Sequence, residues 1–205
     1  MERDFPRGGY LRKILRVDLS TGKISVELPE TRLLQQYIGG TGLGMRLLYD
    51  ETMPGSDPFD VRNSIILATG PLTGTLVPGS GTYSAVSRNT LTGLVVACQS
   101  NGFFGARLKY AGYDAVIIQG RAEKLVYLHI HDDKASIEDA SGLAGKGAFA
   151  TESWLRKKYG EENRSSRISI VAIGPAGENR ERFACPTRQK KHKNTRCAEA
   201  TPPAR

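Results

Sequence analysis

The sequence has few cysteines, no long apolar run and no secretory signal, and each absence excludes a class of protein. Its three cysteines, Cys98, Cys185 and Cys197, are widely spaced and form no C-x-x-C pair. This excludes a zinc ribbon and a four-cysteine iron–sulfur cluster built by this chain alone. No apolar run approaches the roughly 18 residues that a membrane-spanning helix requires. The N-terminus carries charges of both signs and lacks an apolar signal core. We therefore expect a cytoplasmic protein without disulfides.

Most of the net charge of +8 lies at the C-terminal end of the chain. Residues 188–205 contain six Lys or Arg and one Glu, a net charge of +5, which leaves only +3 for the rest. The predicted domain therefore lacks the excess of basic residues that a nucleic-acid-binding face requires. The same segment has no aromatic and no branched apolar residue, so it cannot bury enough surface to offset its ordering entropy. We predict one domain over residues 1–187 and a disordered basic tail over residues 188–205.

Acidic residues are entirely missing from the most distinctive stretch, residues 70–105, which contains seven glycines. It alternates short apolar runs with loops of Gly, Thr, Ser, Asn and Pro. Because glycine has no Cβ, such loops can bring backbone N–H groups close to a bulky anion. The alternative is a set of tight turns that join strands of one sheet, and composition alone favours the turns.

Local patterns in the first 70 residues predict four elements. Residues 10–28 alternate apolar and polar side chains around a Ser-Thr-Gly-Lys turn and read as a β-hairpin. Apolar residues at helical spacing predict helices over residues 29–38 and from Thr41 to Leu48. Residues 64–68 form an apolar run that predicts a buried strand.

The second half repeats this order. Residues 125–137 alternate again and turn at Asp132–Asp133, residues 147–159 have helical spacing, and residues 168–179 place an apolar run before a Gly-Pro pair. We read this as a duplication. The predicted fold class is α+β, with two β-sheets, flanking helices and two pseudo-twofold halves.

Three further groups of residues have both a structural and a functional interpretation. His129 and His131 share one face of a predicted strand, and with Asp132 they resemble a metal site, although polar residues on a solvent-facing hairpin explain them better. The glycines of residues 39–44 do not have the G-x-G-x-x-G spacing, so a dinucleotide fingerprint fails, while an anion at the following helix N-terminus is left open. Residues 109–114 are interpreted as a turn whose aromatic rings fill the core.

Several separated motifs together resemble one family. They are VDLSTGKI, GPLTGT, LTG, SNGFFG, KYAGYDAVIIQG and AIGPAGEN, spread over roughly residues 10–187. In this order they resemble the N-terminal domain of the aldehyde ferredoxin oxidoreductases. The resemblance implies a domain that supports a bis-pterin cofactor carrying tungsten or molybdenum. In that family, further helical domains supply the substrate pocket and the cysteines of a 4Fe–4S cluster. Aldehydes are oxidised to carboxylic acids, and ferredoxin accepts the electrons.

The resemblance also assigns cofactor-binding residues. Gln99, Ser100, Asn101 and Gly102 match the family's pterin-contacting segment. Thr82 falls where many members have an arginine, so a charge-assisted contact to phosphate is missing at that position. Asn101, where glycine is usual, is a second departure. No catalytic residue and no metal ligand are expected in this chain.

The family resemblance ends beyond Thr187, where an Arg- and Gly-rich stretch is expected and the basic segment begins instead. We interpret this as a shifted reading frame or a truncated gene, and expect that the chain alone does not oxidise aldehydes. The alternative to a cofactor-binding domain is a non-enzymatic scaffold that binds a separate helical subunit. A nucleic-acid binder acting through the tail ranks last, because charge runs are usually solvated.

Overall fold

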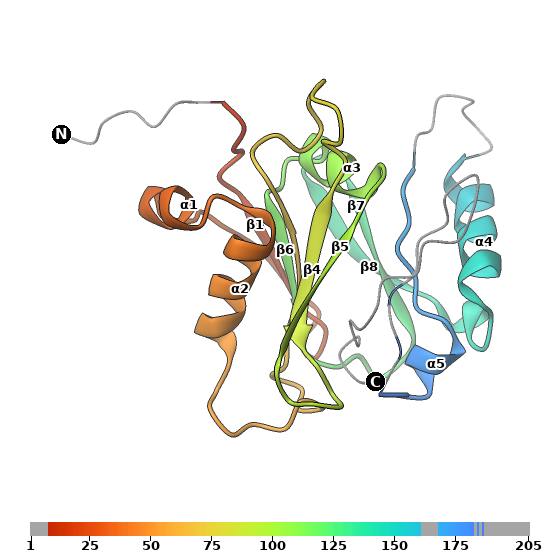
Figure 1. Cartoon of the computed structure of the whole chain (residues 1–205). Coiled ribbons are helices and arrows are strands. Elements are labelled where there is room, and N and C mark those ends of the chain that lie inside the picture. Colours follow the sequence, from red (N-terminus) through yellow and green to blue (C-terminus); the bar gives the residue numbers. More distant parts are fainter. Residues whose placement is uncertain (1–7, 161–167, 183, 185, 187–205) are drawn as a thin grey trace.

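A computed structural model describes residues 8–160, 168–182, 184 and 186. The predicted basic tail, residues 188–205, lies outside the described residues. Figure 1 shows the elements, which are β1 (Ile14–Asp18), β2 (Lys23–Glu27), α1 (Thr31–Tyr37), α2 (Gly40–Glu51), β3 (Ile65–Thr69), β4 (Tyr83–Arg88), β5 (Val95–Ser100), α3 (Phe104–Tyr110), β6 (Ala115–Gln119), β7 (Val126–His131), β8 (Lys134–Asp139), the short 3-10 helix η1 (Ser141–Leu143), α4 (Ala148–Gly160) and α5 (Pro175–Glu178). No helix within the described ranges combines the length and the apolar character needed to cross a membrane.

A six-stranded mixed sheet forms the centre of the molecule, in the order β2-β1-β6-β3-β4-β5. Strand β1 runs parallel to β6, with Ile14 opposite Ala115, and every other pairing in the sheet is antiparallel. Strand β6 therefore inserts between the N-terminal hairpin and β3. Strands β3, β4 and β5 follow one another along the chain, so the turns between them do join strands of one sheet.

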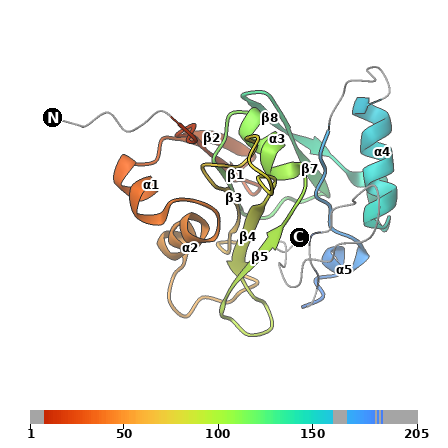
Figure 2. The same cartoon turned by 45° about the horizontal axis from the view of Figure 1, so that its top comes forward.

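Helix α2 covers one face of this sheet. Its Leu43, Leu47 and Leu48 are buried against side chains of β3 and β4. Gly44 lets the helix approach closely, because a Cβ at this position would lie 2.7 Å from Cγ2 of the buried Val86. Figure 2 shows α1 and α2 together on this side of the sheet.

The β7–β8 hairpin forms the second sheet and covers the opposite face. Leu128 and Ile130 point inward and pack on the core around Val17 and Val116, while the alternate residues of β7 point away. Helix α4 lies outside this hairpin (Figure 2). The predicted α+β class with two sheets and flanking helices is confirmed.

The second half repeats the first less completely than the duplication predicted. Its hairpin and helix are present, with the turn at Asp132, whose φ is 51°. Residues 168–174, predicted as a buried strand, instead contribute a single bridge residue, Ala172, and are only half-buried. The Gly-Pro loop starts the short helix α5, because Pro175 has a fixed φ that suits a first helical turn.

A buried ion pair holds the junction between α3 and β6. Lys109 Nζ contacts Asp114 Oδ1, and the two side chains are 7% and 1% exposed. Lys109 also donates to the Gly9 carbonyl at 2.7 Å. Tyr113 fills the core as predicted, at 1% exposed, whereas Tyr110, predicted to do the same, is 63% exposed. Helix α3 ends at Tyr110 and directs this ring outward.

Candidate functional site

The candidate site begins where β4 and β5 meet at one end of the sheet. Tyr83 pairs with Ser100 in the antiparallel register, so the residues just beyond them, Thr82 and Asn101, lie opposite each other. The Thr82 hydroxyl donates to Asn101 Oδ1, and the Gly79 carbonyl oxygen lies 3.3 Å from the same hydroxyl oxygen. Two residues that the sequence assigned to the cofactor are therefore joined directly.

The loop of residues 70–82 folds back onto this strand end. Thr73 closes it, because its hydroxyl accepts from Gly70 N at 2.9 Å and donates to the Thr82 carbonyl at 3.2 Å. At Gly81 a Cβ would lie only 2.1 Å from the Gly102 carbonyl oxygen. The two glycine-rich segments can touch backbone to backbone only because this position has no side chain.

These segments and helix α3 enclose a pocket of about 450 Å³. This volume is in the range of small-molecule and cofactor sites. The residues that line it are Gly74, Thr75, Gly79, Ser80, Gly81, Asn101, Gly102, Phe103, Ala106, Arg107 and Tyr110. None is acidic, and Arg107 is the one formally charged side chain among them. The lining offers neutral hydrogen-bonding groups, a cation and two aromatic rings.

The five residues predicted to bind the cofactor do not gather in one place. Asn101 and Gly102 line the pocket, and Thr82 supports Asn101. Ser100 is buried within the sheet at 6% exposed. Gln99 points toward α2, where its Nε2 reaches Thr41 Oγ1 at 3.5 Å. The assignment of Gln99 and Ser100 to the cofactor stays a prediction.

Sequence reasoning missed the wall formed by α3. Ala106 and Tyr110 are four residues apart, so they lie on one face of the helix, beside Arg107. The Tyr110 hydroxyl donates to the Gly74 carbonyl at 2.6 Å and so joins the helix to the glycine loop. The helical spacing of Phe103, Ala106 and Tyr110 in the sequence could have identified this face.

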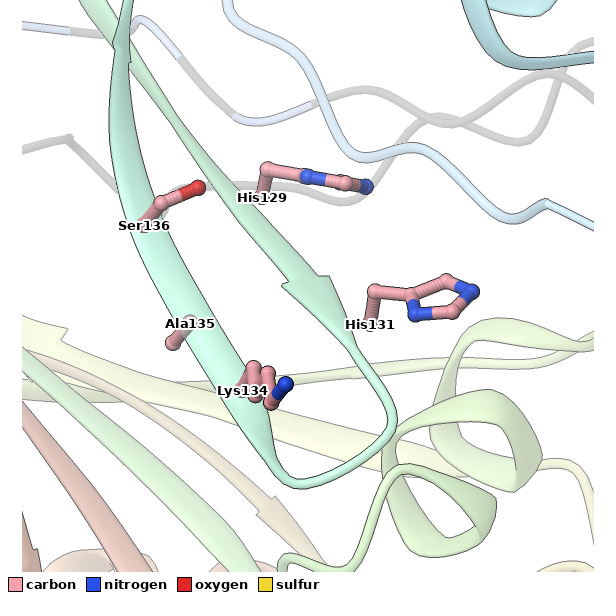
Figure 3. Close-up of a pocket in the computed structure, with 5 residues that line it drawn as sticks. All are labelled: His129, His131, Lys134, Ala135 and Ser136. Atoms are coloured by element: carbon pink, nitrogen blue, oxygen red, sulfur yellow. The ribbon is translucent and has the colours of Figure 1, made fainter.

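A second hollow, of about 560 Å³, lies on the β7–β8 hairpin. Figure 3 shows His129 and His131 projecting from the same side of β7. No group of three His, Cys, Asp or Glu that could hold a metal occurs in the part of the chain that the structure describes. The metal interpretation of this pair therefore has no support here.

His129 is better explained by packing. Its ring stacks on Tyr159 of α4, with the two centroids 4.3 Å apart. Burial lowers the pKa of the His129 imidazole most, and the neighbouring His131 lowers it further. The sequence suggests that the face of β7 with the histidines is exposed to solvent. In the structure, α4 partly covers this face.

Comparisons with known proteins agree with the motifs. The model of the aldehyde ferredoxin oxidoreductase N-terminal domain matches residues 14–200. The tungsten-containing aldehyde ferredoxin oxidoreductase of Pyrococcus furiosus is 45% identical over 176 residues, which are 86% of this chain and 28% of that protein. The WOR-like subunit of the aliphatic sulfonate oxidoreductase from the same organism is 38% identical over 187 residues, covering 85% of this chain and 30% of that protein.

A solved structure gives the same result at the level of the fold. The active site complex BamBC of benzoyl coenzyme A reductase, in complex with 1,5-dienoyl-CoA, contains a chain similar to this one with a TM-score of 0.84 and 34% identity. The match covers 95% of this chain and 28% of the other. The chain thus spans less than a third of the length of each of these relatives. It belongs to the aldehyde ferredoxin oxidoreductase family and corresponds to that family's N-terminal domain.

Proposed function

We propose that this chain is the cofactor-binding domain of a tungstopterin oxidoreductase and that the pocket beside α3 holds part of the pterin. The whole enzyme would oxidise an aldehyde and water to a carboxylic acid, two protons and two electrons, with ferredoxin as the acceptor. The names of the tungsten-containing relatives support tungsten as the metal. The activity and the acceptor follow from the family.

The observation that carries the proposal is the coincidence of two independent results. The motifs that mark the family's pterin segment lie at Asn101 and Gly102, and the structure places both on the wall of a pocket without acidic side chains. A pterin carries a flat ring rich in donors and acceptors together with an anionic phosphate. A lining of short polar side chains, a cation and aromatic rings is complementary to both parts.

The residues present fit such a group. Gly79 lines the pocket with a φ of 81°, a backbone conformation that side chains rarely adopt, so glycine lets the loop turn at this point. The Asn101 amide would hydrogen-bond the ring, while its Oδ1 is oriented by the Thr82 hydroxyl. When bound, the metal–pterin group supplies the two-electron chemistry. The pocket residues bind and orient it.

Electron transfer beyond the pterin requires groups from outside this sequence. A 4Fe–4S cluster takes four cysteine ligands, and the chain has three cysteines without cluster spacing. We therefore propose that the cluster, the substrate pocket and the ferredoxin contact lie in parts of the enzyme outside these 205 residues. On this basis the 205 residues alone would bind a pterin without oxidising aldehydes.

The test is a direct measurement of pterin and metal in the purified chain. We expect tungsten or molybdenum, and a fluorescent pterin after oxidation, to co-purify under anaerobic conditions from a host that makes the cofactor. Asn101→Asp should lower the bound fraction because it adds a negative charge, while it keeps the acceptor for Thr82. Gln35→Glu, the same change on the exposed surface of α1, serves as the control. Absence of pterin from the wild-type chain would contradict the proposal.

The second candidate function is a scaffold that binds a separate subunit. It is favoured by the names of two relatives, one a WOR-like subunit and the other part of the BamBC complex. Exposed apolar side chains beside the pocket, Leu72, Leu76 and Phe103, would suit such a contact. A stable complex with a helical subunit that contains no pterin would favour the scaffold over the cofactor domain.

A further inference from the structure

Arg107 is the charged group of the α3 pocket. It lies in the last turn of α3, half-buried, with its backbone N–H bonded to the Phe103 carbonyl at 2.8 Å. Its side chain lines the pocket together with Asn101 and Gly102. The helix that carries it is packed against the glycine loop, because a Cβ at Gly74 would lie 3.4 Å from Ala106 Cα. The guanidinium is therefore held by a rigid part of the wall.

The other basic residue at this end of α3 is already engaged. Lys109 is buried, pairs with Asp114 and donates to the Gly9 carbonyl. Arg107, in contrast, forms no ion pair with any residue that the structure describes. Its Cζ lies 5.7 Å from the centroid of the Tyr110 ring. Tyr110 is itself fixed by its hydrogen bond to Gly74, so the ring limits where the guanidinium can move.

This arrangement leaves the donors of Arg107 available. The N–H groups of a guanidinium lie in its plane, where they can form two parallel bonds to a phosphate. No acidic residue lines the same pocket to compete for them. A cation within an acid-free pocket that also presents short polar side chains is suited to a phosphate monoester.

We propose that Arg107 binds the phosphate group of the pterin held in the α3 pocket. This inference rests on the proposed function, because the pterin ring is what fills the remainder of the pocket. Arg107 then determines selectivity. It distinguishes a phosphorylated pterin from the same pterin without phosphate, while Asn101 and the glycine backbone contact both forms.

The test compares two fluorescent probes, 6-hydroxymethylpterin phosphate and 6-hydroxymethylpterin, in titrations of the 205-residue chain. We expect the wild-type chain to bind the phosphorylated probe at least about tenfold more tightly, as one charge-assisted bidentate contact allows. Arg107→Gln should remove this preference by weakening the phosphorylated probe much more than the unphosphorylated one. Arg107→Lys, which keeps the charge without the planar fork, should retain part of the preference.

Controls separate this result from folding and from unspecific charge effects. Arg32→Gln removes an equal charge from the exposed surface of α1 and should bind both probes like wild type. Inorganic phosphate should compete with the phosphorylated probe only weakly, since the ring contacts are missing. Equal competition by inorganic phosphate would mean a free-phosphate site, and would overturn the assignment to a pterin phosphate. Circular dichroism and urea midpoints of the Arg107 variants should match wild type.

The outcomes distinguish this proposal from the one on which it rests. If Arg107→Gln keeps the full preference for the phosphorylated probe, Arg107 is not the phosphate ligand, although the pocket still binds pterin. If the wild-type chain binds neither probe, the proposed function fails, and the role of Arg107 fails with it.

Discussion

At the residue scale, the Lys109–Asp114 pair joins segments that are far apart in sequence. Asp114 Oδ2 accepts from the backbone N–H groups of Leu11 and Arg12, at 2.9 and 2.6 Å, while Oδ1 faces Lys109. Because both side chains are nearly fully buried, neither charge has water to replace its partner. The pair therefore fixes the N-terminal segment against the junction of α3 and β6.

Removal of the lysine alone should destabilise the fold more than neutralising both partners. Lys109→Met keeps the apolar stem but leaves the Asp114 carboxylate buried without a counter-charge, which should cost about 3–5 kcal/mol. Adding Asp114→Asn removes that charge and keeps an acceptor for the backbone, so the double variant should recover at least about 1 kcal/mol. Urea unfolding at pH 7 measures both values. A double variant no more stable than Lys109→Met would contradict this account.

How far individual residues were predictable from sequence depended on their surroundings. Asn101 and Gly102 lie inside a recognisable motif, and both line the pocket. Arg107 lines the same pocket without a sequence signal, because its place there depends on which loop packs against α3, and that is a non-local contact. Gln99 and Ser100 directly precede Asn101 in sequence, but neither lines the pocket. Gln99 reaches Thr41 of α2, and Ser100 is buried.

At the element scale, the hairpin β7–β8 and helix α4 are joined by aromatic contacts. His129 stacks on Tyr159, and the hydroxyl groups of Tyr127 and Tyr159 are 2.7 Å apart. Lys158 donates to the Tyr127 hydroxyl at 2.8 Å. These contacts bury the imidazole enough to disfavour its protonated form, so acid should weaken the contact between the two elements.

The stability of the protein should therefore fall as the pH decreases through the histidine range. The folded-state pKa of His129 lies below its value in the unfolded chain, so the unfolded chain takes up the proton first. The contribution of neutral His129 is complete above the unfolded pKa of about 6.5 and decreases from there down to the folded pKa. A titration of the His129 ring by NMR should give a midpoint below the ordinary histidine value.

A matched pair of variants isolates the cause. Tyr159→Phe keeps the stacked ring and should keep the lowered pKa of His129, whereas Tyr159→Ala exposes the imidazole and should raise its pKa. If both variants titrate like wild type, burial by α4 is not the cause of the shift.

The helices and strands that show a local pattern of apolar residues are predicted within a few residues. Strands without such a pattern are not. The hairpins β1–β2 and β7–β8 alternate apolar and polar side chains, and α1, α2 and α4 have helical spacing. Strand β4 is buried along nearly its whole length and shows no alternation, so it was read as part of a loop region. The position of β6 between β1 and β3 is a non-local pairing that no local pattern encodes.

At the scale of the whole molecule, one group of exposed apolar side chains lies beside the candidate site. Leu72, Leu76 and Val77 of the glycine loop are 58%, 102% and 47% exposed, and Phe103 on the pocket wall is 68% exposed. In Figure 1 this loop lies next to α3, at one end of the sheet. The turn between β4 and β5, which carries Leu94, lies at the other end.

This apolar rim should cause self-association of the chain. An apolar patch that water surrounds on one molecule can be buried against the same patch on another. Replacing Leu76 by Ser removes a fully exposed apolar side chain from the rim and should raise the concentration at which association begins about tenfold.

Leu94→Ser is the matched control, because Leu94 is 69% exposed but lies away from the pocket. Sedimentation velocity over a concentration series measures the effect. If Leu94→Ser reduces association as strongly as Leu76→Ser, contact between copies does not depend on the rim, and the pocket end of the sheet has no special role in assembly.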